Sequence, residues 1–137
     1  MSFSVDDISK KTGDVRGFHV EHILSRNEES RNMFASEEEF ETMRNRLGGL
    51  LLLQGKNNLS SGNEMYSDKL RTYSNGLEWG RTLVPDTYHA NLKFKDFNTK
   101  FKEKHGFGFE AIERFDKEAL ERRSRLLYAI VKDIWSV

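Results

Sequence analysis

The sequence predicts an α+β domain in which helix greatly exceeds strand. Several stretches place apolar residues at the three- and four-residue spacing of amphipathic helices, whereas only two short segments are typical of strands. A chain of 137 residues with 12% aromatic side chains is long enough for one packed core and too short for two ordinary ones. We found no internal repeat or low-complexity linker, so residues 1–137 are expected to form a single domain.

The composition limits both the cellular location and the chemistry of a site. The chain has no cysteine, which excludes disulfides and thiolate metal sites and fits a reducing cytosol. No apolar run approaches the roughly 18 residues of a membrane span, and Met1 to Asp7 lack a basic region followed by an apolar stretch. We therefore expect a cytoplasmic protein without a membrane segment.

The charged residues balance, so the total charge does not indicate a nucleic-acid partner. There are 22 Lys and Arg against 22 Asp and Glu, although charge is uneven locally. The sharpest basic cluster consists of Lys93, Lys95, Lys100, Lys102 and Lys104, and the sharpest acidic cluster of Glu28, Glu29, Glu37, Glu38, Glu39 and Glu41. Solvated helix faces are the plain explanation of both clusters.

Two segments are predicted to be strands and to pair as a β-hairpin. Gly17 to Leu24 combines Phe18, Val20, Ile23 and Leu24 with polar residues between them. Leu50 to Leu53 is an all-apolar run bounded by glycine on both sides, which favours a buried strand, with the pairing segment taken as Gly49 to Gln54.

Helices are predicted before and after the second strand. Ser36-Glu37-Glu38-Glu39 is a capping box that begins a helix from about Glu37 to Arg46, and the Gly48-Gly49 pair stops it. Gly55 to Gly62 is rich in Asn, Ser and Gly and is predicted to be a loop. A helix from about Asn63 to Tyr73 follows.

Two longer helices are predicted in the second half of the chain. Asn91 to Lys104 spaces Leu92, Phe94, Phe97 and Phe101 along one helix face. Asp116 caps a second helix that runs to Trp135, and its apolar side is expected to pack against the first, with Trp135 buried.

The segment Phe18-His19-Val20-Glu21-His22-Ile23-Leu24 is the strongest candidate for chemistry. In a regular strand, His19 and Glu21 face one side and His22 faces the other. A carboxylate can then bind a hard divalent cation while the imidazole stays free to take a proton. Alone, the segment also fits a plain surface His-Glu pair.

Further residues in the same order complete a motif. They are Arg44-Asn45-Arg46-Leu47-Gly48-Gly49 with Leu50 to Leu53, then Asn58, the Tyr66 to Tyr73 helix and the terminal Leu126 to Trp135 helix. Together with the His22 segment they resemble the His-Me finger (HNH) nuclease motif, and most of all the C-terminal nuclease domain of GmrSD-type restriction endonucleases. The resemblance implies a mostly helical α+β domain around a ββα-metal element.

The resemblance also implies roles for individual residues. His22 would be the general base, and Glu21 and Asn58 would be metal ligands. His19 would be either a further ligand or a residue that contacts the ligands. A site with so few protein ligands suits Mg²⁺, which keeps several of its waters, and Mn²⁺ is the alternative ion. Gly49 stands where many relatives carry the middle Asn of the motif, and Asn45 is then expected to take over its orienting role.

The implied function is metal-dependent hydrolysis of DNA in modification-dependent restriction or phage defence. Lys56, Lys69 and Arg71 are expected to contact DNA phosphates. Relatives carry an N-terminal nucleotide-hydrolysing sensor domain, and this chain has no glycine-rich phosphate loop, so such a domain would be a partner outside it.

Two alternatives to an endonuclease remain open at the level of sequence. Gly49 and the zero net charge also fit a non-catalytic DNA-binding or assembly module with a degenerate HNH fold. A structural zinc site formed by His19, His22, His89 and His105 is disfavoured by their spacing and by the lack of cysteine.

Overall fold

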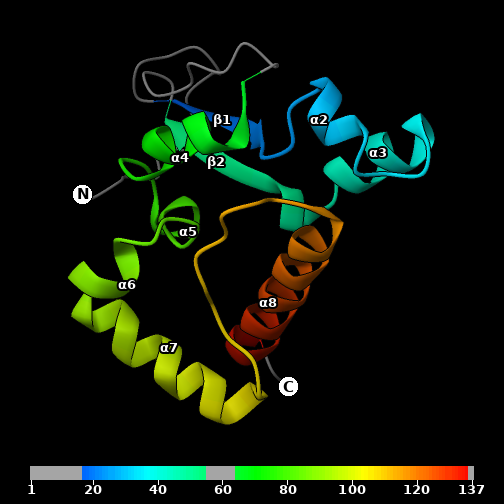
Figure 1. Cartoon of the computed structure of the whole chain (residues 1–137). Helices are drawn as coiled ribbons and strands as arrows, with labels where there is room; N and C mark the ends of the chain where they lie inside the picture. Colours follow the sequence, from blue (N-terminus) through cyan, green and yellow to red (C-terminus); the bar gives the residue numbers. More distant parts are fainter. Residues whose placement is uncertain (1–16, 55–63, 136–137) are drawn as a thin grey trace.

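The computed structural model describes residues 17–54 and 64–135, which form an α+β arrangement dominated by helix (Figure 1). The described part contains one two-stranded antiparallel sheet and seven α-helices. In chain order the elements are β1 (Phe18–His22), α2 (Glu28–Arg31), α3 (Glu37–Arg44), the 3₁₀ turn η1 (Leu47–Gly49), β2 (Leu50–Gln54), α4 (Tyr66–Tyr73), α5 (Glu78–Arg81), α6 (Thr87–Ala90), α7 (Leu92–His105) and α8 (Lys117–Trp135). The predicted α+β class, with helix greatly exceeding strand, is confirmed.

The two strands pair antiparallel as predicted, with Glu21 opposite Leu51 and His22 opposite Leu50. Residues 23–49, with α2, α3 and η1, connect them, so the pair is not a hairpin with a tight turn. The expectation that the Leu50 to Leu53 run is buried throughout is wrong for Leu52, which is 51% exposed. Only one face of this sheet is packed on the core, so burial alternates along β2.

The N-cap of α3 by Ser36 is confirmed, but the Glu39 carboxylate accepts from Ala35 and not from Ser36 as a capping box requires, and the end of the helix is fixed by packing on α8. The Glu39 amide donates to the Ser36 hydroxyl at 3.0 Å, and the Glu39 carboxylate accepts from the Ala35 amide at 3.3 Å. The Gly48 amide donates to Oγ of Ser124 in α8 at 3.2 Å. A Cβ at Gly48 would collide with the Leu120 backbone and with Ser124, so glycine allows η1 to lie directly on α8.

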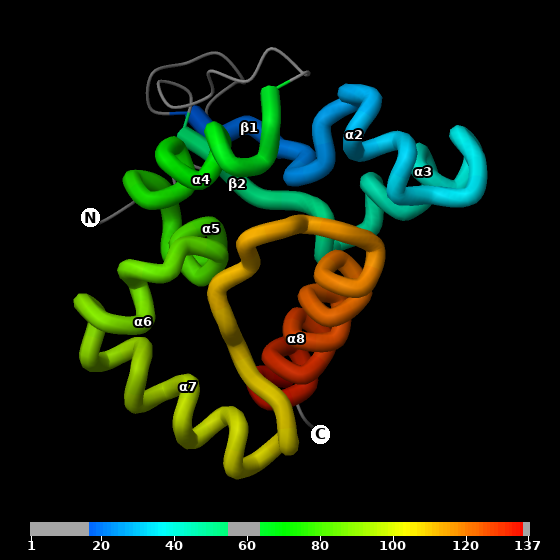
Figure 2. The backbone as a smooth tube through the Cα atoms, in the orientation of Figure 1, coloured from blue at the N-terminus to red at the C-terminus, as the bar shows by residue number. Residues whose placement is uncertain are grey.

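The buried apolar residues form two clusters. The first lies between the sheet, α3, α4 and the beginning of α8, and includes Ile23, Phe40, Leu51, Tyr73, Leu83, Phe115 and Leu120. The second joins α7 to α8 through Phe101, Phe109, Leu126 and Ala129. Residues 106–116 run between these helices in Figure 2, and Asn98 of α7 holds both the amide and the carbonyl of Phe109.

Helix α8 is also tied to α5 by a buried guanidinium. Arg123 is 1% exposed, lies 3.8 Å above the Trp79 ring centroid, and donates to the Trp79 carbonyl at 3.0 Å and to Thr82 Oγ1 at 3.2 Å. Burial lowers the pKa of Arg123 to about 10. Ring stacking and backbone acceptors thus compensate for part of its lost hydration.

The expectation that α8 is buried as far as Trp135 is wrong. Leu126 and Ala129 pack against α7, but every residue from Val131 to Trp135 is exposed, and Trp135 is 73% exposed. The second cluster ends at Ile130, so among the described residues the apolar packing does not reach the last turn of α8, where Asp133 contacts Lys104 and His105. Phe97 of α7 is likewise 47% exposed. Among the described helices, none combines the length and the hydropathy needed to cross a bilayer.

Candidate functional site

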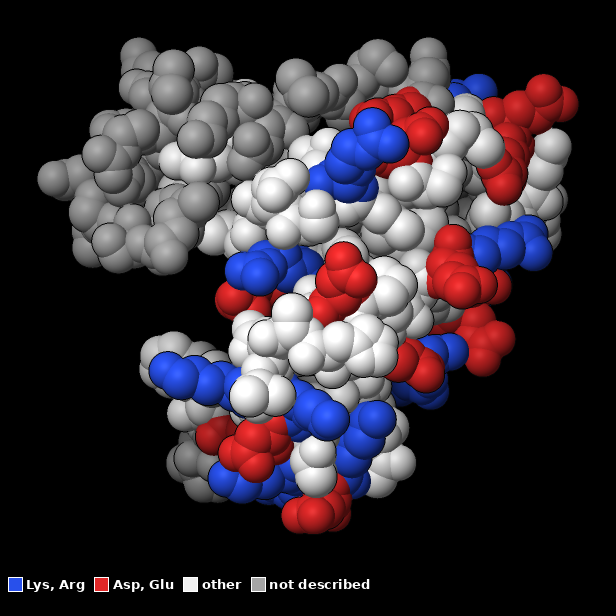
Figure 3. Space-filling view, turned by 60° about the vertical axis from the view of Figure 1, so that its left-hand side comes forward, with Lys and Arg blue, Asp and Glu red and all other residues white. Residues whose placement is uncertain are grey.

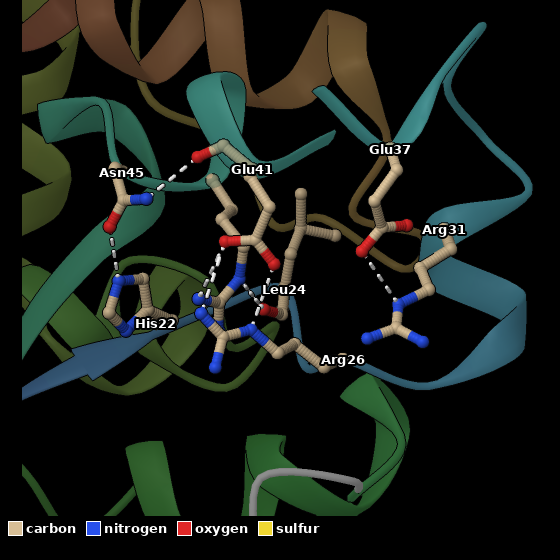
Figure 4. Close-up of polar contacts among 8 residues, drawn as sticks. His22, Leu24, Arg26, Arg31, Glu37, Glu41 and Asn45 are labelled. Carbon is tan, nitrogen blue, oxygen red and sulfur yellow. Dashed lines mark hydrogen bonds and ion pairs between the residues drawn. The ribbon is translucent and has the colours of Figure 1, made fainter. Parts of the chain in front are cut away.

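A hydrogen-bonded chain at the end of β1 places His22 beside the C-terminus of α3 (Figure 4). Nε2 of His22 lies 2.8 Å from Oδ1 of Asn45, and Nδ2 of Asn45 donates to the Glu41 carbonyl at 2.7 Å. Asn45 caps α3, one helical turn after Glu41. The helix therefore positions the amide, and the amide positions the imidazole.

This chain determines which nitrogen of His22 carries the proton in the neutral ring. A carbonyl oxygen only accepts, so the Asn45 NH₂ group must face Glu41 and its oxygen must face His22. Nε2 of His22 must then donate to that oxygen. In the neutral imidazole, Nδ1 is left with the lone pair that a general base needs.

The backbone around His22 is held by three other segments. The Ile23 amide donates to the Gly49 carbonyl at 2.9 Å. Nζ of Lys69 in α4 donates to the His22 carbonyl at 2.7 Å, and Nε of Arg44 in α3 donates to the Leu24 carbonyl at 3.1 Å. Polar contacts from α3, α4 and η1 thus fix the end of β1.

Glu21 lies on the opposite face of the sheet from His22, in the interior. Its Oε1 accepts from Nζ of Lys69 at 2.7 Å, and the Tyr73 hydroxyl lies 3.4 Å away. Glu21 is 5% exposed and Lys69 is 2% exposed. Burial, followed by the neighbouring Glu21 charge, raises the pKa of Tyr73 well above its ordinary range. Glu21 and Lys69 therefore form a buried ion pair between the sheet and α4.

Nζ of Lys69 contacts Oε1 of Glu21, one of the two oxygens through which the implied metal-ligand role would act. His19 lies in β1 opposite Leu53, on the same face as Glu21. No three His, Cys, Asp or Glu side chains in residues 17–54 and 64–135 are grouped so that they could hold a metal ion. The third implied ligand, Asn58, lies outside the described residues.

The three residues expected to contact DNA phosphates lie in different surroundings. Lys69 is buried, so its ammonium supports the backbone of His22 and does not face solvent, contrary to the expected DNA contact. Arg71, two residues further along α4, is exposed. Lys56 lies outside the described residues.

Reasoning from sequence missed Arg26 and Glu41. The Arg26 guanidinium donates to both carboxylate oxygens of Glu41, at 2.9 and 3.1 Å. This hydrogen bond is the largest cause that lowers the pKa of Glu41, and burial opposes it. The four-residue spacing of Glu41 and Asn45 on one helix was the available signal, because it brings these residues onto the same helix face.

The four histidines do not converge on a zinc site in the described part of the chain. His105 ends α7, at the opposite end of the molecule from β1 (Figure 1), where its Nε2 lies 2.7 Å from Oδ2 of Asp133. His89 belongs to α6. The structure therefore gives the zinc alternative no support.

Comparison with known proteins gives one family. Searches of curated proteins and of solved structures found no match. A family model described as "GmrSD restriction endonucleases, C-terminal domain" matches residues 2–130, which is nearly the whole chain. The chain therefore belongs to the family of GmrSD restriction endonuclease C-terminal domains.

Proposed function

We propose that this domain is an HNH-type DNA endonuclease or nickase that hydrolyses phosphodiester bonds in modification-dependent restriction or phage defence, with His22 as general base. The family is one of restriction endonucleases, and a nuclease role in restriction follows from membership. The observation that carries the proposal is the chain from His22 through Asn45 to the Glu41 carbonyl. It leaves Nδ1 of the neutral ring as the basic atom.

In the proposed mechanism, Nδ1 of His22 takes a proton from the water that attacks phosphorus. The P–O bond to one sugar oxygen breaks, and the released alkoxide takes a proton from solvent. The resulting imidazolium still donates through Nε2 to Asn45, because an amide oxygen accepts from both the neutral and the protonated ring. Asn45 is therefore a positioning residue that holds the ring before and after proton transfer. Lys69 and Arg44 restrict the backbone on which the ring is carried.

We further propose that β1, β2 and α4 form the ββα-metal element of the resemblance. The antiparallel strand pair, and the contact of Lys69 of α4 with Glu21 of β1, support this order of two strands and a helix. The segment between β2 and α4 carries Asn58 and Lys56. A requirement for a divalent cation, Mg²⁺ before Mn²⁺, rests on the resemblance alone, and no step above uses the ion.

DNA is the proposed substrate, in the cytoplasm, with Arg71 and Lys56 as candidate phosphate contacts. Phosphate contacts of this kind position DNA without reading its sequence. An N-terminal nucleotide-hydrolysing sensor domain is the proposed partner. This chain, residues 1–137, would be the single nuclease domain of that assembly.

A plasmid nicking assay with the 137-residue chain in Mg²⁺ or Mn²⁺ tests the proposal. We expect cleavage by the parent, loss of cleavage in His22→Ala, and parental cleavage in His89→Ala, which removes an exposed histidine of α6. Chelation with EDTA should stop the parent. Cleavage by His22→Ala at the parental rate would refute the assignment.

A second candidate, a non-catalytic DNA-binding or assembly module, is favoured by the Glu21–Lys69 pair. A carboxylate that already holds an ammonium is a poor ligand for a divalent cation. This candidate predicts that the parent binds DNA but does not cleave it in either Mg²⁺ or Mn²⁺. The same assay, run beside a binding assay, separates the two functions.

A further inference from the structure

Cationic and aromatic side chains alternate along one exposed stripe of α8. The stripe consists of Arg125, Tyr128, Lys132 and Trp135, all of which are exposed. At 3.6 residues per turn, these positions fall within about 80° of the helix circumference and extend about 15 Å along the axis. Tyr128 is 71% exposed and Trp135 is 73% exposed, so both residues are largely open to solvent.

A groove of about 450 Å³ runs beside this stripe, between α8 and the end of α7. Its lining includes Arg125, Tyr128 and Lys132 from α8, and Lys104 and Phe107 from the other side. A second hollow adjoins it through Phe107 and Arg125 and adds Lys102 and Arg122. Two neighbouring hollows thus share an aromatic ring and a guanidinium.

The acidic groups in these hollows are already paired. Asp133 accepts from Lys104 and from His105, each at 2.7 Å, and Glu110 pairs with Arg122. Within the described part of the chain, Lys102, Arg125 and Lys132 make no ion pair. Although the whole chain is neutral, this surface therefore carries a local excess of positive charge. Figure 3 shows Lys and Arg interspersed with Asp and Glu at the lower end of the molecule, where α7 lies in Figure 1.

We propose that this stripe and groove form a second nucleic-acid contact, one that binds an unpaired strand. Exposed rings provide stacking platforms for bases, and the interleaved cations provide contacts for the phosphates between them. Bases in a duplex are already stacked on one another, so the rings favour a single strand. The inference rests on the proposed function only in taking DNA cleavage as the process that this contact would serve, and binding of the strand itself does not depend on cleavage.

Charge argues against an apolar protein surface as the occupant of this stripe. Such a partner would remove Arg125 and Lys132 from water without supplying acceptors, which is costly for cations that have no ion pair of their own. A phosphate backbone supplies acceptors at every nucleotide. The ends of α7 and α8, which carry this surface, lie at the opposite end of the molecule from β1 (Figure 1), so it would hold a strand away from His22.

Fluorescence anisotropy with a labelled oligothymidine strand tests the proposal. Measurement in EDTA without divalent cations keeps binding separate from cleavage, so the result does not depend on whether His22 is a base. We expect Tyr128→Leu and Trp135→Leu each to weaken binding about 5-fold or more, because leucine keeps the apolar area and loses the stacking face. Tyr128→Phe and Trp135→Phe should bind like the parent.

The salt dependence of strand binding measures the contribution of the cationic side chains separately. Arg125→Gln should lower the slope of log K against log salt by about 0.7, as expected for one lost contact to a single strand. All of these side chains are exposed, so thermal melting should be unchanged in each variant. A duplex competitor of the same length should compete poorly.

Three results would overturn the proposal. One is parental affinity in Tyr128→Leu and Trp135→Leu, and another is failure of the parent to bind the strand at low salt. The third is a monomer–dimer equilibrium, seen by sedimentation, that Tyr128→Leu abolishes, because a second copy would then be the occupant. A chain that binds the strand as expected but does not nick plasmid would refute the proposed function and leave this inference standing.

Discussion

Glu21 and His22 are neighbours in β1 and face opposite sides of the two-stranded sheet. Glu21 pairs in register with Leu51 and holds Lys69 in the interior, whereas His22 pairs with Leu50 and contacts Asn45. Strand alternation thus separates a buried ion pair from an accessible imidazole by a single residue. Lys69 joins the two, because it binds the Glu21 carboxylate and the His22 carbonyl.

Replacement of Lys69 by methionine should destabilise the fold strongly. The change leaves the Glu21 carboxylate buried without its ammonium partner, which costs about 3 to 5 kcal/mol in comparable buried pairs. Urea unfolding measures the difference. Arg71→Met is the matched control, because Arg71 is exposed on the same helix, and it should change stability by less than about 0.5 kcal/mol.

The double variant Glu21→Gln/Lys69→Met distinguishes an unpaired charge from lost packing. It should recover much of the lost stability, because it removes the charge that Lys69→Met leaves unpaired. A Lys69→Met protein as stable as Arg71→Met would show that the pair contributes nothing to the fold.

Substitution of Asn45 should change the reaction through His22 and leave DNA affinity unaltered. Asn45→Ala removes the acceptor for Nε2 but not the base, so kcat should fall by less than the roughly 100-fold or more expected on loss of a general base. Asn45→Asp should move the acidic limb of the pH–rate profile to higher pH, because a carboxylate stabilises the imidazolium. An unshifted profile would exclude Asn45 as a positioning residue.

Acid should remove the contribution of Glu41 to stability. The Arg26 hydrogen bond holds the pKa of Glu41 below its ordinary value of 4.5. Because the unfolded state then binds more protons in acid, the contribution is present above about pH 4.5 and is lost as the pH falls through the lower folded value. Thermal melting from about pH 6 to about pH 3 should show a smaller loss in Glu41→Gln than in the parent.

Glu38→Gln provides the control for that titration. Glu38 is exposed on the same helix and makes no ion pair within the described residues, so its variant should follow the parent across the whole range. Identical pH profiles for Glu41→Gln and the parent would contradict the assigned linkage.

Substitution of single side chains by alanine should distinguish the buried part of α8 from its exposed end. Leu126 is 2% exposed in the cluster with α7, so Leu126→Ala should cost about 2 to 5 kcal/mol. Trp135→Ala should change stability by less than about 0.5 kcal/mol, because the ring is exposed. Denaturant unfolding of both variants measures the contrast, and a large loss in Trp135→Ala would place that ring in an interface.

The sequence by itself determined most of the local structure. Three local features depend only on residues within a few positions of each other. They are the cap of α3 by Ser36, the cap of α8 by Asp116, and the alternation of Glu21 and His22. Contacts between near neighbours repeat in any fold, so spacing alone predicts them. The residues that resemble the nuclease motif lie within the segment that the family model matches, except for the part of the Leu126 to Trp135 helix that follows residue 130.

Tertiary structure alone decided which of these side chains meet and which face water. Lys69 was expected on DNA and lies in the interior, because α4 turns that side toward Glu21. Trp135 has the apolar character of a core residue and is exposed, because the apolar contacts between α7 and α8 extend only as far as Ile130. The contact between His22 and Asn45 likewise depends on how α3 returns to the end of β1. Burial depends on the faces that distant segments bring together, and a residue's own neighbours in sequence do not contain that information.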